Sequence, residues 1–267
     1  MSFLTPNQAE KFLPKAYNSF AKEFSSTRHY QWKEFERLSK TVPEKGNILD
    51  LGCGNGRLYK FLQEKKFRGE YFGADISEKL LQEAQKNNPE ISENFIEAGF
   101  LDFPQCLDSA RQPVKKIKFS QIWAVASFHH LSKISERNIT LQNIYNSLTH
   151  DGEFICTVWN LWEQKKYEPQ KNKAYWRAFF NPLWNKRDFI IPWGKQKTNR
   201  YYYSFDKIEL KILLKENGFE ISDIFYSEGK KNICVRAKKI SDKNNIEKFY
   251  VHSHPFHKIS ISETIKK

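Results

Sequence analysis

A glycine-rich stretch near residue 50 constrains the fold of this chain more than any other feature. It reads Ile48-Leu49-Asp50-Leu51-Gly52-Cys53-Gly54-Asn55-Gly56, an apolar run that ends in a carboxylate and three alternating glycines. Glycine adopts positive φ and has no Cβ, so a ligand can approach the backbone closely. Residues 57–62 have a helical pattern, and a helix N-terminus suits a ligand with acceptor or anionic groups. The stretch therefore predicts a strand, a tight ligand-binding loop and a helix in succession.

The spacing of the glycines discriminates among nucleotide-binding loops. A dinucleotide fingerprint requires Gly-x-Gly-x-x-Gly, but Arg57 occupies the place of its third glycine, and no Gly-Lys-Ser/Thr of a P-loop follows. A second carboxylate, Asp75, ends the next apolar segment, residues 71–75. A carboxylate about 20 residues beyond a glycine loop is well placed to accept hydrogen bonds from two ribose hydroxyls.

Asp50 with Gly52-x-Gly54-x-Gly56, followed by Asp75, resembles the class I S-adenosylmethionine-dependent methyltransferases, and the resemblance covers residues 47–239. The alternative is a glycine-rich turn with an ordinary surface aspartate. Gly99 stands where the family usually has an adenine-facing aspartate, so backbone groups or Asp102 are expected to read the adenine. The resemblance implies S-adenosylmethionine as cofactor, no metal, and a donor-binding set consisting of Tyr17, Arg28, Asp50, Gly52, Cys53, Gly54, Asn55, Gly56, Asp75, Ile76, Phe100, Asp102 and Ala126.

Strand-like and helix-like segments alternate along the chain, which predicts an α/β fold with a doubly wound, Rossmann-like sheet. Ligands in such folds bind beyond the carboxyl ends of the strands. Three parts are expected: an N-terminal helical arm (1–46), a methyltransferase domain (47–239) with an insertion at about 160–204 before the last helix, and a polar tail (240–267). The expected strands cover 47–51, 70–75, 94–97, 119–126, 153–159, 219–226 and 231–239. Expected helices cover 57–65, 78–86, 132–148 and 207–217, with a loop-rich connection over 99–118.

A formal net charge of +13 favours polyanionic partners such as nucleic acid, although a lysine-rich composition is the plainer explanation. Aromatic residues make up 15% of the chain and accompany basic residues in the insertion, a pairing that suits stacking on unpaired bases.

Four scattered cysteines predict neither a zinc site nor a disulfide framework. The start of the chain does not resemble a signal peptide, and no apolar run is long enough to span a bilayer, so a cytoplasmic protein is expected. The histidines of the tail, between 252 and 257, are interpreted as an exposed cluster rather than a metal site.

A narrower resemblance is to the methyltransferases that esterify carboxymethyluridine at the wobble position of tRNA. It is carried by Phe24-Ser25-Ser26-Thr27-Arg28, by Ala126-Ser127-Phe128-His129-His130 with the later Arg137, by Trp159, and by Arg200-Tyr201-Tyr202-Tyr203-Ser204-Phe205, where Tyr203 replaces the family's histidine. The resemblance implies tRNA as acceptor. One of the adjacent histidines is expected to line the cleft, with His129 preferred. The residues proposed for catalysis are His129, Arg28, Arg200 and Tyr201.

A carboxylate acceptor is ionised at neutral pH and needs no base. It needs a cationic clamp, for which Arg28, Arg137 and Arg200 are candidates, because guanidinium binds carboxylate bidentately. The alternative for each is a surface ion pair. Trp159, Trp193, Tyr201 and Tyr202 are expected to form a stacking wall or, equally, to pack in the core.

Three functions remain open on the sequence. The first is methylation of a tRNA wobble-uridine side chain, from carboxymethyl to methyl ester. The second is methylation of a small molecule under an aromatic lid. The third is a non-catalytic RNA-binding relative, which the intact glycine loop and Asp75 disfavour. Eukaryotic members of the resembling family work with a small zinc-binding protein, so such a partner is also implied.

Overall fold

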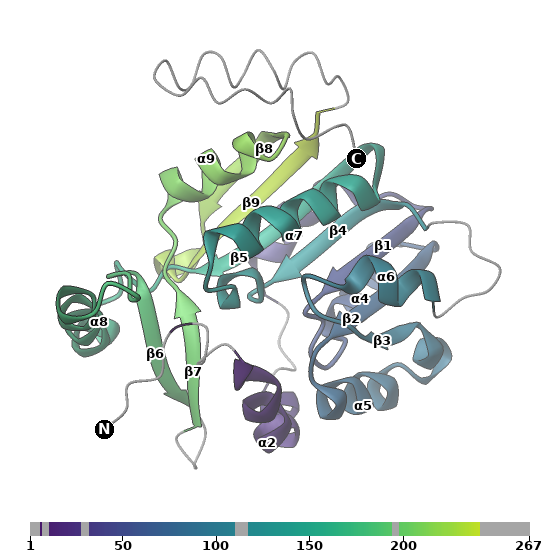
Figure 1. Cartoon of the computed structure of the whole chain (residues 1–267). Coiled ribbons are helices and arrows are strands. Elements are labelled where there is room, and N and C mark those ends of the chain that lie inside the picture. The colour runs from purple at the N-terminus through teal and green to yellow at the C-terminus, as the bar shows by residue number, and fades with distance from the viewer. Residues whose placement is uncertain (1–5, 7–10, 28–31, 110–116, 194–197, 241–267) are drawn as a thin grey trace, which may run out of the picture.

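A computed structural model describes residues 6, 11–27, 32–109, 117–193 and 198–240 (Figure 1). Its centre is a seven-stranded sheet in the order β3-β2-β1-β4-β5-β9-β8. The first five of these strands run parallel, and β9 is antiparallel to both β5 and β8. This arrangement confirms the predicted α/β fold with a doubly wound sheet. The strands are β1 (Asn47–Leu51), β2 (Glu70–Asp75), β3 (Phe95–Glu97), β4 (Phe119–Val125), β5 (Leu148–Trp159), β8 (Phe219–Tyr226) and β9 (Asn232–Lys239).

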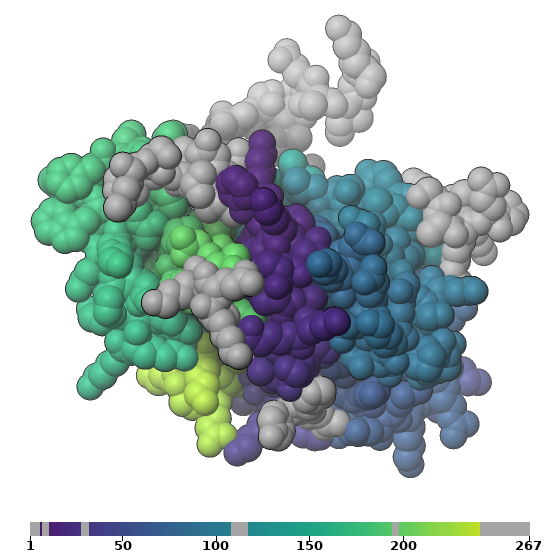
Figure 2. Space-filling model, turned by 90° about the horizontal axis from the view of Figure 1, so that it is seen from below, coloured from purple at the N-terminus to yellow at the C-terminus, as the bar shows by residue number. Residues whose placement is uncertain are grey.

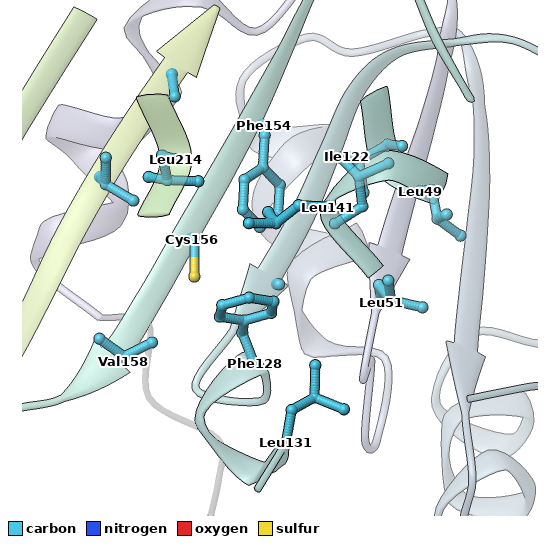
Figure 3. Packing of buried hydrophobic residues seen from close by; sticks show 14 of the residues in the cluster. Leu49, Leu51, Ile122, Phe128, Leu131, Leu141, Phe154, Cys156, Val158 and Leu214 are labelled. Carbon is cyan, nitrogen blue, oxygen red and sulfur yellow. The ribbon is translucent and has the colours of Figure 1, made fainter. Parts of the chain in front are cut away.

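Helices cover both faces of this sheet, because successive strand residues point to opposite sides. Leu49 and Leu51 of β1 join the cluster under α6 (Phe103–Ser109), α7 (Ile134–Ser147) and α9 (Lys207–Glu216), and Figure 3 shows part of this cluster. Ile48 faces the other way, into a cluster with α3 (Glu34–Leu38), α4 (Arg57–Glu64) and α5 (Glu78–Asn87). The two cores hold the carboxyl ends of β1, β2 and β4 at one edge of the sheet.

The helix caps follow the sequence closely. The Ser77 hydroxyl accepts a hydrogen bond from the Leu80 amide at the start of α5, and the Asp206 carboxylate caps α9 through the Glu209 amide. Such caps satisfy backbone donors that would otherwise be unpaired in the first turn. Short 3-10 turns also occur among the described residues: η1 (Ser39–Thr41), η2 (Pro89–Asn94), η3 (Phe128–His130), η5 (Glu228–Lys230) and, within the insertion, η4 (Lys165–Tyr167).

Two segments differ from the sequence-based expectation. The connection expected to be loop-rich contains α6, whose Phe103 and Leu107 are buried one helical turn apart, and Pro104 is tolerated because it lies in the first turn. Strand β5 begins at Leu148, not after Gly152. Its pairing with β4 shifts register between Phe119 and Gln121, so the intervening residues of β5 leave the ladder as an irregularity.

The described part of the insertion at about 160–204 is folded and contains, besides η4, an α-helix and a two-stranded hairpin. These are α8 (Glu168–Phe180) and the antiparallel pair β6 (Asp188–Trp193) and β7 (Thr198–Tyr203). The outward face of α8 exposes Tyr175, Trp176, Phe179 and Phe180. Figure 1 places α8 at the outer end of the molecule, beyond the hairpin.

The N-terminal arm lies across the carboxyl edge of the sheet. Helix α2 (Leu13–Ser26) contacts α5 on one side and β7 on the other. Figure 2 shows it as a purple ridge between the green insertion and the blue α4–α5 side. Arg28 and the histidines of the tail lie outside the described residues.

Within the described ranges, no helix combines the length and apolar character needed to cross a membrane. The same ranges hold no group of three metal-ligating side chains.

Candidate functional site

A cavity of about 400 Å³ opens at the carboxyl edge of the parallel strands, where β1, β2 and β4 deliver their loops. Its floor comes from Gly52, Gly54 and Ser127, and helix α2 contributes Tyr17 and Phe24 to its roof. This volume lies in the range of small-molecule binding sites, and its position is the one expected for a ligand in an open α/β sheet.

The glycine loop approaches its neighbours so closely that side chains are excluded. Gly52 and Gly54 have φ of +82° and +57°. A Cβ on Gly52 would lie 2.4 Å from the Ser127 Cβ, whereas one on Gly54 would meet nothing nearer than 3.5 Å, at Phe24. Gly52 is therefore required by packing, and Gly54 leaves open space on the cavity side.

The carboxylate of Asp75 is oriented by the backbone. One oxygen accepts a hydrogen bond from the Gly54 amide at 2.8 Å, and the other accepts one from the Ser77 amide at 2.9 Å. Burial raises the pKa of Asp75, and the amides of Ser77, Gly54 and Ile76 act in the opposite direction. Because a carboxylate has about four acceptor sites and these amides do not fill them all, Asp75 retains acceptor capacity toward the cavity that it lines. Such a pair of acceptors fits a vicinal diol such as that of a ribose.

Most of the residues predicted to bind the donor line this cavity. They are Tyr17, Gly52, Gly54, Asp75, Ile76, Phe100, Asp102 and Ala126, and Gly99 lines it as well. Asp102 also accepts a hydrogen bond from the Gly99 amide at 2.7 Å, so its carboxylate shapes the loop after β3. Ala126 directly follows β4 at the cavity wall and has φ of +52°, a conformation that L-residues seldom adopt.

Four of the predicted donor-binding residues do not line the cavity: Asp50, Cys53, Asn55 and Gly56. Asp50 shares the face of Ile48 and accepts a hydrogen bond from the Tyr71 hydroxyl at 2.8 Å. Cys53 packs in the α4–α5 core. Asn55 donates to the Ser25 hydroxyl at 3.2 Å, and Gly56 is the left-handed N-cap of α4. These residues shape the loop from behind.

Asp50 gives a testable pH dependence of stability. Burial raises its pKa to about 7, against smaller opposing effects of Tyr71 and Arg57. The folded state therefore binds this proton more tightly than the unfolded state, and stability falls as pH rises from about 4 to about 7. Above pH 7, the ionised Asp50 carboxylate lowers the free energy of unfolding by about 4 kcal/mol relative to the protonated form.

Asp50→Asn is expected to raise the free energy of unfolding at pH 8 by roughly 2 kcal/mol, because the new amide lacks an acceptor and offsets part of the gain. Urea titrations of both proteins at pH 5 and pH 8 measure this, with the gain absent at pH 5. A variant less stable than the wild type at pH 8 would show that Asp50 is stabilised as a carboxylate.

A chain of hydrogen bonds crosses the wall of the cavity opposite the glycine loop. His130 contacts the Tyr201 carbonyl oxygen through Nδ1 at 2.7 Å and the Tyr17 hydroxyl through Nε2 at 2.9 Å. Burial lowers the pKa of His130 to about 3, so the ring is neutral. A carbonyl can only accept, so Nδ1 carries the proton and Nε2 accepts from Tyr17. The Tyr17 oxygen in turn accepts a hydrogen bond from Arg200 Nη1 at 3.3 Å.

Arg200 is a buried cation at this wall, with 1% of its surface exposed. Its Nε and Nη2 have no hydrogen-bond partner among the described residues, and it forms no ion pair there. Five aromatic rings surround the guanidinium at 5.2–5.9 Å, those of Tyr17, Phe20, Trp159, Trp193 and Tyr202. Cation–π contacts offset part of the desolvation cost but supply no acceptor for the N–H groups. The guanidinium thus keeps two nitrogens with donor capacity at the cavity that it lines.

The structure places His130, and not the preferred His129, at the cavity. His129 is fully buried behind the cavity wall, where its Nδ1 accepts a hydrogen bond from the Trp159 amide at 3.1 Å. Burial lowers its pKa well below the usual value. It is His130, the next residue, that lines the cavity. Both lie on the 3-10 turn η3, whose geometry decides which ring faces out.

Tyr201 and Arg137 are also placed away from the cavity. The Tyr201 hydroxyl donates to Asp188 at 2.7 Å, within the β6–β7 hairpin. Arg137 donates to the carbonyl oxygens of Leu131 and Ser132 and lies 3.4 Å from the centre of the Tyr203 ring. Both are therefore built into the scaffold.

Of the predicted stacking wall, Trp159 lines the cavity. Tyr202 is stacked beneath it, with ring centres 4.8 Å apart and planes at 11°. Trp193 packs on Phe20 with ring centres 4.5 Å apart. The wall is thus one accessible indole supported by buried aromatic rings.

Sequence reasoning missed Trp32 and Arg57 as lining residues. Arg57 was identified only as a departure from the dinucleotide fingerprint, although its place directly after Gly56 puts it at the start of α4 beside the loop. Trp32 carried no signal, because its proximity to the cavity arises from the path of the N-terminal arm.

Comparison with known proteins agrees with this geometry. A family model described as a methyltransferase domain matches residues 49–154. The tRNA (carboxymethyluridine(34)-5-O)-methyltransferase of Schizosaccharomyces pombe is 25% identical over 241 residues, which cover 86% of this chain and 96% of that protein. The Arabidopsis thaliana protein of the same name is 26% identical over 155 residues, covering 58% of this chain and 34% of that protein. The chain thus spans about a third of the Arabidopsis protein.

Two solved structures illustrate the fold. The Burkholderia thailandensis 1,6-didemethyltoxoflavin-N1-methyltransferase, with bound 1,6-didemethyltoxoflavin and S-adenosylhomocysteine, has a TM-score of 0.60 at 16% identity, covering 90% of this chain and 92% of that one. A Haloferax volcanii methyltransferase in complex with the Trm112 methyltransferase activator has a TM-score of 0.60 at 14% identity, covering 85% and 97%. Residues 49–154 thus match the methyltransferase domain family, and the chain as a whole shares the fold of these two solved structures.

Proposed function

We propose that this enzyme transfers a methyl group from S-adenosylmethionine to the carboxylate of a carboxymethyl group on a wobble uridine of tRNA. The observation that carries the acceptor class is Arg200, a buried guanidinium with two nitrogens left without a partner at the cavity wall. A buried cation of this kind matches a carboxylate, which it can bind through two parallel hydrogen bonds. The names of the relatives supply the tRNA part of the proposal.

The residues of the glycine-loop side fit the donor. The two oxygens of Asp75 suit the ribose hydroxyls, and the loop at Gly54 has room for a ligand against the backbone. Ile76, Phe100 and Leu101 supply apolar surface next to Asp75, which suits the adenine ring. When bound, the donor supplies a methyl group already activated by its sulfonium.

The chain's own residues then have two tasks. Arg200 holds the acceptor carboxylate, with its position set by Tyr17 and through it by His130. The aromatic groups around Arg200 exclude water from the path between the two reactants. Correct alignment of two bound reactants and exclusion of water account for most of what such a displacement needs.

The proposal requires no general base, which predicts a simple pH profile. His129 and His130 are neutral because burial lowers the pKa of both, that of His130 to about 3. With both substrates saturating, kcat is expected to stay level across about pH 6–8, where a free histidine changes its charge. A step in kcat near the ordinary histidine pKa that disappears in His130→Gln would contradict this mechanism.

The proposal is tested by incubating the protein and S-adenosylmethionine with tRNA that contains carboxymethyluridine, and by mass spectrometry of the nucleosides. The expected product is the methyl ester, which mild alkali converts back to the acid. Failure to label any tRNA pool, together with turnover of an acidic metabolite, would favour the small-molecule alternative. RNA binding without any turnover would favour the non-catalytic one.

Two finer expectations belong to this proposal. A small protein partner is predicted by the resemblance to the tRNA-modifying family, and one fold neighbour is a methyltransferase in complex with the Trm112 activator. Co-purification of the tagged chain from its host tests this. A cytoplasmic location is expected for an enzyme that acts on tRNA.

A further inference from the structure

A second hollow, of about 480 Å³, adjoins the donor cavity. The two share Trp32, Arg57 and Trp159 as a common border. The groove beyond this border is formed by the start of α3, by η4 and by the turn between β8 and β9. These segments are distant in the sequence and meet only in the folded chain. A ligand held at Arg200 can therefore extend past Trp159 into this groove.

The groove carries an excess of positive charge. Its lining includes the cations Lys33, Arg57, Lys166 and Lys231, and the two carboxylates Glu34 and Glu228. The carboxylates are already engaged, since Glu228 pairs with Lys33 at 2.8 Å and Glu34 accepts a hydrogen bond from Asn232 at 2.7 Å.

Lys166 and Lys231 are the remaining cations of the groove to consider, and Lys231 lies close enough to Glu228 to help Lys33 lower the pKa of that carboxyl group. Neither forms an ion pair within the part of the chain that the structure describes. They come from different segments, η4 and the β8–β9 turn, so they reach the groove from separate elements.

Aromatic rings are interleaved with these charges. Tyr167 lies beside the Lys166 ammonium, 4.7 Å from its ring centre, and Arg57 lies 4.4 Å from the centre of the Trp32 ring. Trp159 has one face stacked on Tyr202 and lines both hollows. Aromatic rings beside cations form a surface on which bases stack while the charges follow the phosphates.

We propose that this groove is a binding site for single-stranded RNA, and that it holds the nucleotide next to the one that is methylated. Lys166 and Lys231 contact its phosphates, and Tyr167 supplies a stacking surface for its base. The inference rests on the proposed function and adds the site and the groups of the RNA that it reads. An unpaired loop suits the groove, because only an unpaired base can leave its stack and lie on a tyrosine ring.

The test compares Lys166→Glu, Lys231→Glu and Lys211→Glu as a matched control. Lys211 is an exposed lysine of α9 that lines neither hollow. Fluorescence anisotropy with an anticodon stem-loop RNA is expected to give about tenfold weaker binding for each groove variant and wild-type binding for the control. Calorimetric affinity for S-adenosylhomocysteine is expected to stay unchanged in all three, which verifies that they fold.

A salt titration sharpens the test. Replacing Lys166 and Lys231 together by alanine is expected to reduce the slope of log K against log salt by about 1.4, that is 0.7 for each lost phosphate contact on a single strand. Tyr167→Ala is expected to weaken RNA binding without changing this slope. Tyr167→Phe is expected to retain wild-type RNA binding.

The outcomes separate the two proposals. If wild-type enzyme methylates tRNA but the groove variants bind and react like the control, the groove assignment is overturned and the function stands. If wild-type binding depends on the groove lysines but no tRNA is methylated, the groove stands and the proposed function falls. Absence of any RNA binding by the wild type overturns both.

Discussion

Replacing Arg200 with methionine is expected to lower kcat/KM for methyl transfer about a thousandfold, which corresponds to ~4 kcal/mol. The guanidinium is the only described cation buried in this wall beside Tyr17 and His130, and its Nε and Nη2 have no partner of their own. The variant removes the proposed contact with the acceptor carboxylate. Steady-state kinetics with tRNA as the varied substrate measure the effect.

The same substitution should leave the fold intact, which separates a lost contact from a damaged protein. Arg200 has no acidic partner among the described residues, so an apolar side chain of similar volume removes a desolvation cost. The melting temperature is expected to be equal to or above that of the wild type. Arg200→Lys keeps the charge but not the planar fork, and intermediate activity is expected. Full activity of the methionine variant would eliminate Arg200 as the carboxylate receptor.

Replacing Asp75 with alanine is expected to weaken binding of S-adenosylmethionine and S-adenosylhomocysteine about a hundredfold, or ~3 kcal/mol. Its two oxygens are the proposed acceptors for the ribose hydroxyls, and charge-assisted hydrogen bonds of this kind are stronger than neutral ones. The substitution also removes the partners of the Gly54 and Ser77 amides. Isothermal titration calorimetry measures the loss.

Asp102→Ala is the informative comparison, because this carboxylate lines the same cavity but interacts with the Gly99 amide. Its effect on donor affinity is expected to be smaller than that of Asp75→Ala. Equal affinity of the wild type and Asp75→Ala would refute the ribose assignment.

The local chemistry of the donor side could be predicted from the sequence because it lies in short continuous stretches. The strand, loop and helix around Gly52, the carboxylate at the end of β2 and the Ser77 cap all follow from spacing and residue type. The order of the elements then indicates which strand ends meet at the edge of a parallel sheet. Phe100 and Ala126 reach the cavity for this reason.

Other features of the site could not be predicted from the sequence, because the direction in which a side chain points depends on the folded backbone. Asp50 belongs to the motif, but the alternation of side chains along β1 points it into the core behind the loop. Adjacent histidines look equivalent in a sequence, and a 3-10 turn decides that His130 and not His129 reaches the wall. Tyr201 and Arg200 are neighbours on β7, so they point to opposite faces of the hairpin. The path of the arm that brings Trp32 to the cavity depends on tertiary packing alone.

A crystal structure with S-adenosylhomocysteine bound would show whether one cavity holds donor and acceptor in line. We expect the ribose hydroxyls on the Asp75 carboxylate and the sulfur facing the wall formed by Tyr17, His130 and Arg200. S-adenosylhomocysteine bound elsewhere, or with its sulfur turned away from Arg200, would contradict this expectation.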